Sequence, residues 1–292
     1  MVSIKNIDAF YEAKKIINKA KKDISDSEIY ILLENANSYK DYTELVLNFN
    51  ENLAKPQLFY ENLNKIIDGE PIQYVINEAP FLSLLLYVDK RVLIPRPETE
   101  GLMLNLFKYI KENNLNYKNM LEICTGSGCI ALSYKKDFFD ASVYTSDISS
   151  DAIEVAKLNA KNNNLNINLF VGDKLEPILK LNKKFDVFVS NPPYVENKND
   201  IEEKVKKYEP MNAVYVEDGT TFYEYFFKCH KLFLNKDAIM AFEINYDQEE
   251  KLKTLISLYF KNENIQYKFV KDIYGLTRYL FIIRGYKNGI LN

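Results

Sequence analysis

The stretch Phe185-Asp186-Val187-Phe188-Val189-Ser190-Asn191-Pro192-Pro193-Tyr194 decides how the rest of the chain is interpreted. Its first six residues are mostly apolar and rich in β-formers, which predicts a buried strand. Asn191 precedes a proline and is therefore biased towards an extended backbone. The two prolines fix φ and lack N–H donors. The sequence thus predicts a rigid loop at the carboxyl end of a strand, where open α/β sheets bind their ligands.

This loop is rich in hydrogen-bond acceptors. We expect the side-chain oxygen of Asn191 and the backbone carbonyl of Pro192 to face a cleft, with the flat ring of Tyr194 beside them. Such an arrangement suits a planar NH2 group that is about to be alkylated. A rigid turn without chemistry explains the four residues equally well when they are considered alone, so the rest of the chain must decide.

Composition excludes several classes of protein. The chain has 292 residues, of which 47% are hydrophobic and 27% charged, as in a globular protein of one large or two ordinary domains. The net charge of −3 gives no general attraction to nucleic acid. The cysteines are not spaced as a metal clip, so we expect no bound metal. The absence of a long apolar run and of a signal core predicts a cytoplasmic protein.

The sequence contains one histidine, His230, within an amphipathic helical pattern. We expect it on the surface of that helix. A mechanism that requires a histidine base is therefore disfavoured.

The chain is predicted to have three regions. Residues 1–76 are expected to form a substrate-recognition bundle of four or five short helices, since Ser25-x-x-Glu28 and Asp41-x-x-Glu44 are capping-box patterns. Gly69 follows a helical pattern over residues 57–67 and is expected to end it. Residues 77–97 are expected to form a β-hairpin linker with strands at 81–88 and 92–94. Residues 98–292 form the third and largest region.

Strands and helices alternate through the third region, which predicts an α/β fold with a doubly wound, mostly parallel sheet. The last two strands are expected to be antiparallel, because only a short turn separates them. Segment 196–209 is expected to be a mobile loop beside the site. The expected strands cover 120–124, 142–145, 167–171, 185–190, 238–244, 265–271 and 278–284, and the expected helices 129–136, 151–162, 220–234 and 247–260.

A glycine-containing loop, Cys124-Thr125-Gly126-Ser127-Gly128, joins the first of these strands to a helix. Glycines let the backbone approach a ligand at a helix N-terminus. Gly126-x-Gly128-x-x-Ala131 fits both a dinucleotide and an S-adenosylmethionine site. Asp147 ends the second strand, where it could accept ribose hydroxyls or cap the next helix. Asp173 ends the third strand, where it could receive an adenine amino group, and this favours an adenosyl ligand.

Several motifs together resemble those of the HemK/PrmC family, from about residue 57 onwards. They are Gly69-Glu70-Pro71-Ile72-Gln73-Tyr74, Leu93-Ile94-Pro95-Arg96-Pro97-Glu98-Thr99-Glu100, Glu122-x-Cys124-Thr125-Gly126-Ser127-Gly128, Asn191-Pro192-Pro193-Tyr194, Tyr208-Glu209-Pro210 and Asp272-x-x-Gly275-x-x-Arg278. The resemblance implies a Rossmann-like class I methyltransferase that uses S-adenosyl-L-methionine. It also implies methylation of the glutamine amide nitrogen in the Gly-Gly-Gln motif of class I peptide chain release factors, which act in translation termination.

The resemblance assigns roles to individual residues. It implies catalytic roles for Asn191, Pro192 and Tyr194, and contacts of these residues and Pro193 with the substrate glutamine. Two residues depart from the family pattern, because Cys124 stands where glycine is usual and Lys174 where an aromatic residue is frequent. The expected cofactor contacts are Cys124, Thr125, Gly126, Ser127, Gly128, Asp147, Lys174 and Asn191, with Asp173 added from its place at a strand end.

Other functions remain open from the sequence. A methyltransferase for a ribosomal-protein glutamine or for a nucleic-acid amino group is the nearest alternative. Base substrates usually require a basic face, and the acidic chain argues against one. A non-catalytic adaptor and a nicotinamide dehydrogenase fit less well. We expect a monomer that acts on class I release factors, without nucleic-acid or membrane partners.

Overall fold

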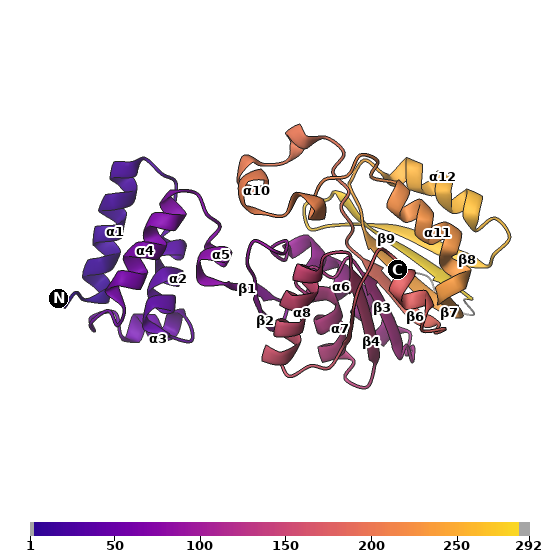
Figure 1. The fold of residues 1–292 in the computed structure, drawn as a ribbon, viewed down its shortest axis with the longest axis horizontal. Coiled ribbons are helices and arrows are strands. Elements are labelled where there is room, and N and C mark those ends of the chain that lie inside the picture. The colour runs from indigo at the N-terminus through magenta and orange to yellow at the C-terminus, as the bar shows by residue number, and fades with distance from the viewer. Residues whose placement is uncertain (1–2, 286–292) are drawn as a thin grey trace. The chain divides into compact units, whose positions relative to one another are not determined.

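The structure, a computed structural model, describes residues 3–285. The chain forms two compact units, which meet in the sequence between Glu78 and Ala79 (Figure 1). The first unit is helical and the second contains the main sheet. No helix among the described residues is long and apolar enough to span a bilayer.

The first unit is a helical bundle, as predicted. Its apolar core includes Phe10, Leu32 and Leu63 from three different helices. The capping box at Ser25 is confirmed, because Ser25 Oγ accepts the Glu28 N–H and Glu28 Oε2 accepts the Ser25 N–H at 2.9 Å. The helices are α1 (Asn6–Ala20), α2 (Asp26–Asn37), α3 (Tyr42–Leu47), α4 (Pro56–Ile67) and α5 (Ile72–Ile76).

A small hairpin follows, but not at the predicted residues. Its strands are β1 (Glu78–Phe81) and β2 (Leu84–Tyr87), so the expected strands at 81–88 and 92–94 are wrong. The apolar run is interrupted by a turn at Leu82, whose backbone is left-handed with φ of 50°. The Leu82 N–H donates to Glu100 Oε1 at 2.6 Å. This side-chain bond takes the place of the strand hydrogen bond that the Leu82 N–H gives up in the turn. Residues 92–94 belong to no strand, and the Val92 N–H donates to the Asp89 carbonyl at 3.1 Å.

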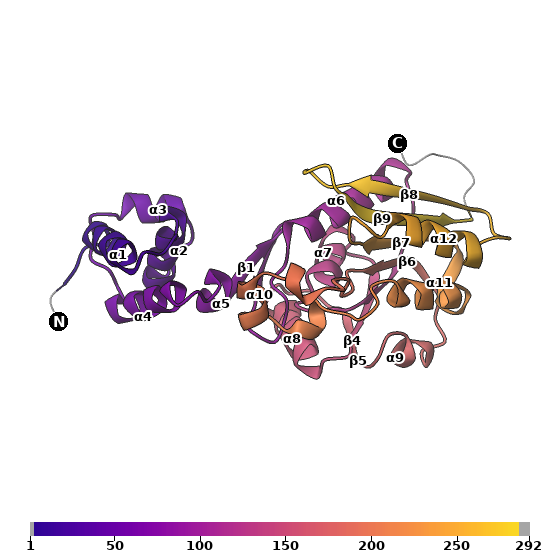
Figure 2. The ribbon, with the colours of Figure 1, turned by 90° about the horizontal axis from the view of Figure 1, so that it is seen from above.

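The described residues of the second unit form a seven-stranded sheet of order β5-β4-β3-β6-β7-β9-β8. The first five strands of this order are parallel to one another, and β9 is antiparallel to both of its neighbours. Figure 2 shows β8 and β9 at one end of the sheet and β5 at the other. The predicted α/β doubly wound fold is confirmed. The strands are β3 (Asn119–Ile123), β4 (Ser142–Asp147), β5 (Asn168–Val171), β6 (Phe185–Ser190), β7 (Leu234–Glu243), β8 (Ile265–Lys271) and β9 (Thr277–Arg284).

Helices cover both faces of the sheet, because successive strand residues point to opposite sides. Val187 of β6 packs into one apolar cluster and Phe188 into the other. Helices α6 (Pro97–Glu112), α7 (Cys129–Asp137) and α8 (Ser150–Asn162) contribute to the first cluster. Helices α9 (Glu176–Leu179), α11 (Thr221–Phe233) and α12 (Glu249–Tyr259) contribute to the second. Burial on both faces explains why β6 shows no polar alternation.

Two further expectations are wrong. His230 is buried rather than exposed, because it lies on the inward stripe of α11, stacks on Phe260 and contacts Glu263 Oε1 at 2.8 Å. Segment 196–209 is not an irregular loop, because it contains a 3₁₀ turn at Lys198–Asp200 and the helix α10 (Glu203–Tyr208). Its mobility stays a prediction.

Asn159 of α8 joins the hairpin to the first loop of the sheet. Its side chain is fully buried, and its Oδ1 accepts the Tyr87 N–H at 2.6 Å. Its Nδ2 donates to the carbonyls of Tyr87 and Ser127, both at 2.9 Å. One side-chain amide therefore forms hydrogen bonds with three backbone groups of two separate segments.

We predict that Asn159→Asp lowers the free energy of unfolding by about 1–3 kcal/mol for each buried partner left unpaired, because aspartate cannot donate to the two carbonyls. Urea unfolding measures the change. Asn163→Asp is the matched control, since the Asn163 amide donates to the carbonyl of Leu85 in an exposed position. Equal destabilisation by the two variants would contradict the role of Asn159.

Candidate active site

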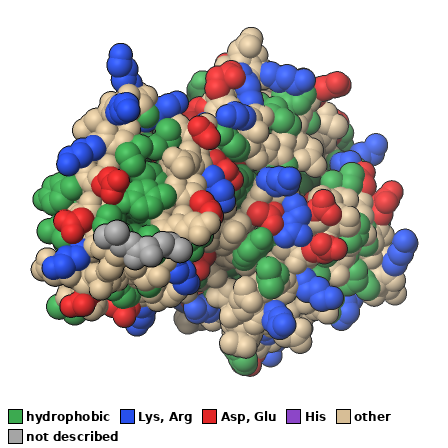
Figure 3. All heavy atoms as spheres, turned by 60° about the vertical axis from the view of Figure 1, so that its left-hand side comes forward, with side chains coloured by type: hydrophobic (Ala, Val, Ile, Leu, Met, Phe, Trp, Pro, Cys, Tyr) green, Lys and Arg blue, Asp and Glu red, His purple; other side chains and the backbone are tan. Residues whose placement is uncertain are grey.

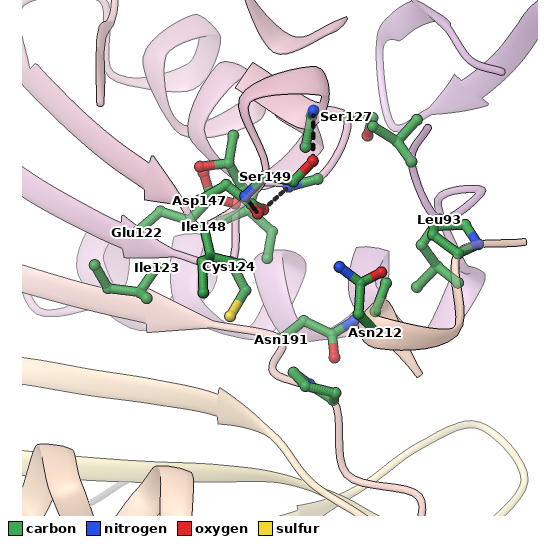
Figure 4. A pocket seen from close by; sticks show the side chains of 18 of the residues that line it. Leu93, Glu122, Ile123, Cys124, Ser127, Asp147, Ile148, Ser149, Asn191 and Asn212 are labelled. Atoms are coloured by element: carbon green, nitrogen blue, oxygen red, sulfur yellow. Dashed lines mark hydrogen bonds between the residues drawn. The ribbon is translucent and has the colours of Figure 1, made fainter. Parts of the chain in front are cut away.

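A cavity of about 350 Å³ lies at the carboxyl ends of the parallel strands in the second unit. It is formed by the loops after β3, β4, β5 and β6, together with residues 91–96 and 210–222 (Figure 4). The strand order reverses between β3 and β6, and open sheets bind ligands at such a reversal.

The structure brings most of the predicted site residues to this cavity. Gly128, Pro192 and Tyr194 do not line it. Gly128 begins α7 with φ of 83°, and a Cβ there would lie 3.2 Å from the Cβ of Ala156, so glycine is needed for close helix packing. Pro192 is buried. The predicted residues that do line the cavity are Cys124, Thr125, Gly126, Ser127, Asp147, Asp173, Lys174, Asn191 and Pro193.

The first loop turns sharply at Cys124. Its φ is 68°, in the left-handed region that costs a residue with a Cβ about 1–2 kcal/mol. The Cys124 N–H donates to the Ser146 carbonyl at 3.0 Å, which holds the turn against β4. Burial raises the pKa of the Cys124 thiol, with a smaller contribution from Asp147, so this cysteine is neutral. The departure from glycine is therefore accommodated with strain.

Glu122, at the end of β3, lines the cavity although the sequence did not mark it as a site residue. Its Oε2 accepts the Thr145 hydroxyl at 2.7 Å, whereas its Oε1 is buried and has no partner among residues 3–285. Burial raises the pKa of this carboxyl well above its usual value. A buried acceptor without a partner suits an N–H or cationic group of a ligand. The sequence could have indicated this residue, because Glu122 stands two positions before the glycine-containing loop.

Asp147 ends β4 and is held by backbone amides. Its Oδ2 accepts the Gly126 N–H at 3.0 Å, and its Oδ1 accepts the Ser149 N–H at 2.9 Å. Figure 4 shows Asp147 and Ser149 side by side, with hydrogen bonds drawn as dashed lines. Burial raises its pKa, although these amides act in the opposite direction. Ser149, not Asp147, caps α8 by accepting the Ala152 N–H at 3.2 Å. Each carboxylate oxygen keeps a second lone pair for a ligand hydroxyl.

Asp173 and Lys174 follow β5 as an ion pair. Lys174 Nζ lies 3.0 and 3.1 Å from the two carboxylate oxygens of Asp173. The same ammonium group lies 5.4 Å from the centroid of the Tyr225 ring. Asp173 and Lys174 line the cavity, whereas Tyr225 does not.

Asn191 belongs to a chain of polar side chains at the end of the sheet. Its Nδ2 donates to Thr99 Oγ1 at 3.0 Å, and Thr99 Oγ1 donates to Glu243 Oε2 at 2.7 Å. The Tyr194 hydroxyl donates to Glu243 Oε1 at 3.0 Å. Burial raises the pKa of Glu243, while Thr99, Tyr194 and the charge of Arg278 lower it. Burial and Glu243 both raise the pKa of Tyr194, so its hydroxyl stays a neutral donor.

An ion pair has its buried carboxylate in the segment that follows β6. Arg96 Nη2 contacts Glu209 Oε1 at 2.6 Å, and Glu209 Oε2 accepts the Ile94 N–H at 3.1 Å. The side chain of Glu209 is only 3% exposed, whereas that of Arg96 is 33% exposed. Pro210 and Asn212, directly after this pair, line the cavity.

We predict that Arg96→Met increases hydrogen exchange of residues 196–213, because Glu209 would then keep only one donor for a buried carboxylate. Hydrogen–deuterium exchange with mass spectrometry measures the change. Glu203→Gln is the control, since it removes an exposed pair with Lys206 in the same segment. Unchanged exchange in Arg96→Met would show that the pair does not hold the segment.

Comparison with known proteins agrees with the fold and the motifs. The family model of the methyltransferase small domain matches residues 102–208. The catalytic domain of hMettl16, in complex with MAT2A 3′UTR hairpin 1, has the same fold with a TM-score of 0.53 at 15% identity, over 70% of this chain and 76% of that one.

Curated relatives are more similar. The release factor glutamine methyltransferase of Bacillus cereus is 38% identical over 82% of this chain and 86% of its own length. That of Clostridium acetobutylicum is 35% identical over 95% of this chain and 98% of its own length. At this identity and coverage, the chain belongs to the release factor glutamine methyltransferase family.

Proposed function

We propose that this chain transfers a methyl group from S-adenosyl-L-methionine to the side-chain amide nitrogen of the glutamine in the Gly-Gly-Gln motif of class I peptide chain release factors. Membership of the family supports the reaction and its substrate. The observation that carries the proposal in the structure is the place of Asn191, which lies in one cavity with Glu122 and Asp147.

The residues of the cavity fit the cofactor. The unpartnered Oε1 of Glu122 suits the ammonium group of a bound amino acid, and Asp147 has lone pairs for ribose hydroxyls. Asp173 lies at the next strand end, where we place the adenine amino group. S-adenosyl-L-methionine supplies an electrophilic methyl group on a sulfonium. The loop Cys124–Gly128 and Lys174 complete the proposed contacts.

The proposed role of the chain is to orient the substrate amide. An amide nitrogen is a poor nucleophile, because its lone pair is delocalised. In this proposal Oδ1 of Asn191, a residue that lines the cavity, accepts one N–H hydrogen of the substrate amide. The Pro192 carbonyl accepts the other and the Tyr194 ring packs on the amide plane, although neither of these two residues lines the cavity in this structure. Orientation of this kind contributes roughly 7–11 kcal/mol in well-aligned systems. Acceptors that favour positive charge on nitrogen add to it. The proton leaves the nitrogen after methyl transfer, when the positive charge on the nitrogen has made it acidic. His230 cannot act as a base before transfer, since it is buried and its ring bonds to Glu263.

The partner and location follow as proposals. Class I release factors are the protein partners, the helical bundle contributes to their recognition, and the enzyme acts as a cytoplasmic monomer. Acidic and basic side chains are interspersed on the face shown in Figure 3, so the described residues on that face offer no continuous basic surface to a nucleic-acid backbone.

We predict that Asn191→Ala loses about 100-fold or more in turnover, because one of two acceptors for the substrate amide is removed. The assay uses methyl-labelled S-adenosyl-L-methionine with a wild-type release factor, with the same factor carrying Gln→Ala in its Gly-Gly-Gln motif, and with duplex DNA. Label on the wild-type factor alone supports the proposed substrate. Label on DNA, or near-normal turnover by Asn191→Ala, would overturn the proposal.

We also predict that Asp147→Asn weakens binding of S-adenosylhomocysteine by about tenfold, since loss of a charged acceptor typically costs 1.5–3 kcal/mol. Isothermal titration calorimetry measures the dissociation constant. Asp151→Asn is the control, because Asp151 lies in the first turn of α8 and does not line the cavity. An unchanged constant in Asp147→Asn would argue against a role in ribose binding.

A further inference from the structure

The side-chain amide of Asn191 has nearly the same shape in its two orientations but the opposite chemistry. With Oδ1 towards the substrate it accepts an N–H, and with Nδ2 towards the substrate it presents a second donor. The proposed reaction requires the first orientation. Whatever fixes the amide therefore determines whether the site can hold an NH2 group at all.

The hydrogen-bond chain behind Asn191 fixes this choice by the number of protons available. Glu243, as a carboxylate, can only accept, and its two oxygens receive the hydroxyls of Thr99 and Tyr194 at 2.7 and 3.0 Å. Thr99 has one hydroxyl proton, which it gives to Glu243. The Thr99 oxygen can then only accept from its other neighbour, which lies 3.0 Å away and must present Nδ2 of Asn191.

Three different elements hold the members of this chain rigidly. Thr99 is in the first turn of α6 and is 2% exposed, and Glu243 ends β7 and is 1% exposed. Glu243 is paired with Tyr279 in β9, and its backbone carbonyl accepts the Tyr223 hydroxyl of α11 at 2.8 Å. Asn191 follows β6 directly. The orientation is thus set by the sheet and not by a mobile side chain.

A buried carboxylate is an expensive way to hold a strand end, since burial opposes its charged form. An apolar residue would pack the same position at lower cost. A carboxylate can, however, accept two hydroxyl protons at once, which an apolar residue cannot do. One of those hydroxyls belongs to Thr99, which contacts Asn191, and the other to Tyr194, which is itself part of the candidate substrate loop.

We propose that Thr99 and Glu243 are positioning residues that fix the side-chain amide of Asn191 with its oxygen towards the substrate nitrogen. This inference rests on the proposed function of Asn191. Neither residue touches the substrate amide in this scheme. Their effect passes through Asn191 and is therefore on turnover rather than on cofactor binding.

The test compares Thr99→Val, Thr99→Ser and Asn191→Ala in the full chain. Each is assayed for kcat and KM with a release factor, for binding of S-adenosylhomocysteine by calorimetry, and for melting temperature. We expect Thr99→Val to lose roughly 100-fold in kcat while the dissociation constant is unchanged, because the amide of Asn191 is no longer fixed. Thr99→Ser keeps the hydroxyl and retains most turnover.

Two further variants identify the route. Glu243→Gln replaces an obligate acceptor by a group that also donates, so Thr99 is free to reverse its hydroxyl, and we expect kcat to fall. The double variant Thr99→Val with Asn191→Ala is expected to be no slower than Asn191→Ala alone, since Thr99 acts only through Asn191. An additive loss in the double variant would contradict this route.

The outcomes separate this inference from the proposed function. Near-normal turnover by Asn191→Ala would overturn the proposed function itself. An inactive Asn191→Ala together with a fully active Thr99→Val would leave the function standing and refute the positioning role. Weaker cofactor binding with unchanged kcat in Thr99→Val would make Thr99 a cofactor contact instead. Loss of activity in Thr99→Ser equal to that in Thr99→Val would also refute the role of the hydroxyl.

Discussion

The parallel pairing of β3 with β6 is the constraint on which the rest of the second unit depends. The chain passes from β3 to β4 and β5 on one side, and only then returns to β6 on the other. Register pairs Ile123 with Ser190, so both strands end at the same level. The Ser190 hydroxyl donates to the Ile123 carbonyl at 2.6 Å and closes the gap between them. The loops that begin at Cys124 and Asn191 therefore leave the sheet side by side and enclose the cavity.

Carboxyl groups at strand ends are a second feature of the site, and two of them, Glu122 and Glu243, are buried. Glu122, Asp147 and Glu243 all lie at strand ends, and burial raises the pKa of each. Their surroundings differ, however. Asp147 is held by backbone amides, Glu243 by hydroxyl groups, and Glu122 by one hydroxyl only. Both oxygens of Glu243 accept hydroxyl groups of the protein, whereas Glu122 Oε1 has no partner among residues 3–285 and remains available to a ligand.

The sequence was sufficient for the sheet because both faces of its central strands, such as β3 and β6, are buried and the turns are marked by glycine, proline and asparagine. It failed at the β1–β2 hairpin, since a continuous apolar run does not reveal where Leu82 reverses the chain. It failed at His230, because the buried face of a helix can include one imidazole whose ring bonds to a carboxylate elsewhere, here Glu263 in the turn after α12. Thr99 and Glu243 were missed for another reason, namely that they approach each other only when α6 and β7 are folded.

The segment between β6 and α11 has its two ends joined by backbone hydrogen bonds, which we call its base. Val195 is bridged to Tyr215, and the N–H groups of Val195 and Val216 bond across the base at 3.1 and 3.0 Å. Everything from 196 to 213 is thus a closed excursion whose ends stay fixed. Glu209 in this excursion pairs with Arg96, and Pro210 and Asn212 line the cavity. The composition of the excursion therefore contributes to the wall of the cavity, while the bridged base fixes where the chain leaves β6 and returns towards α11.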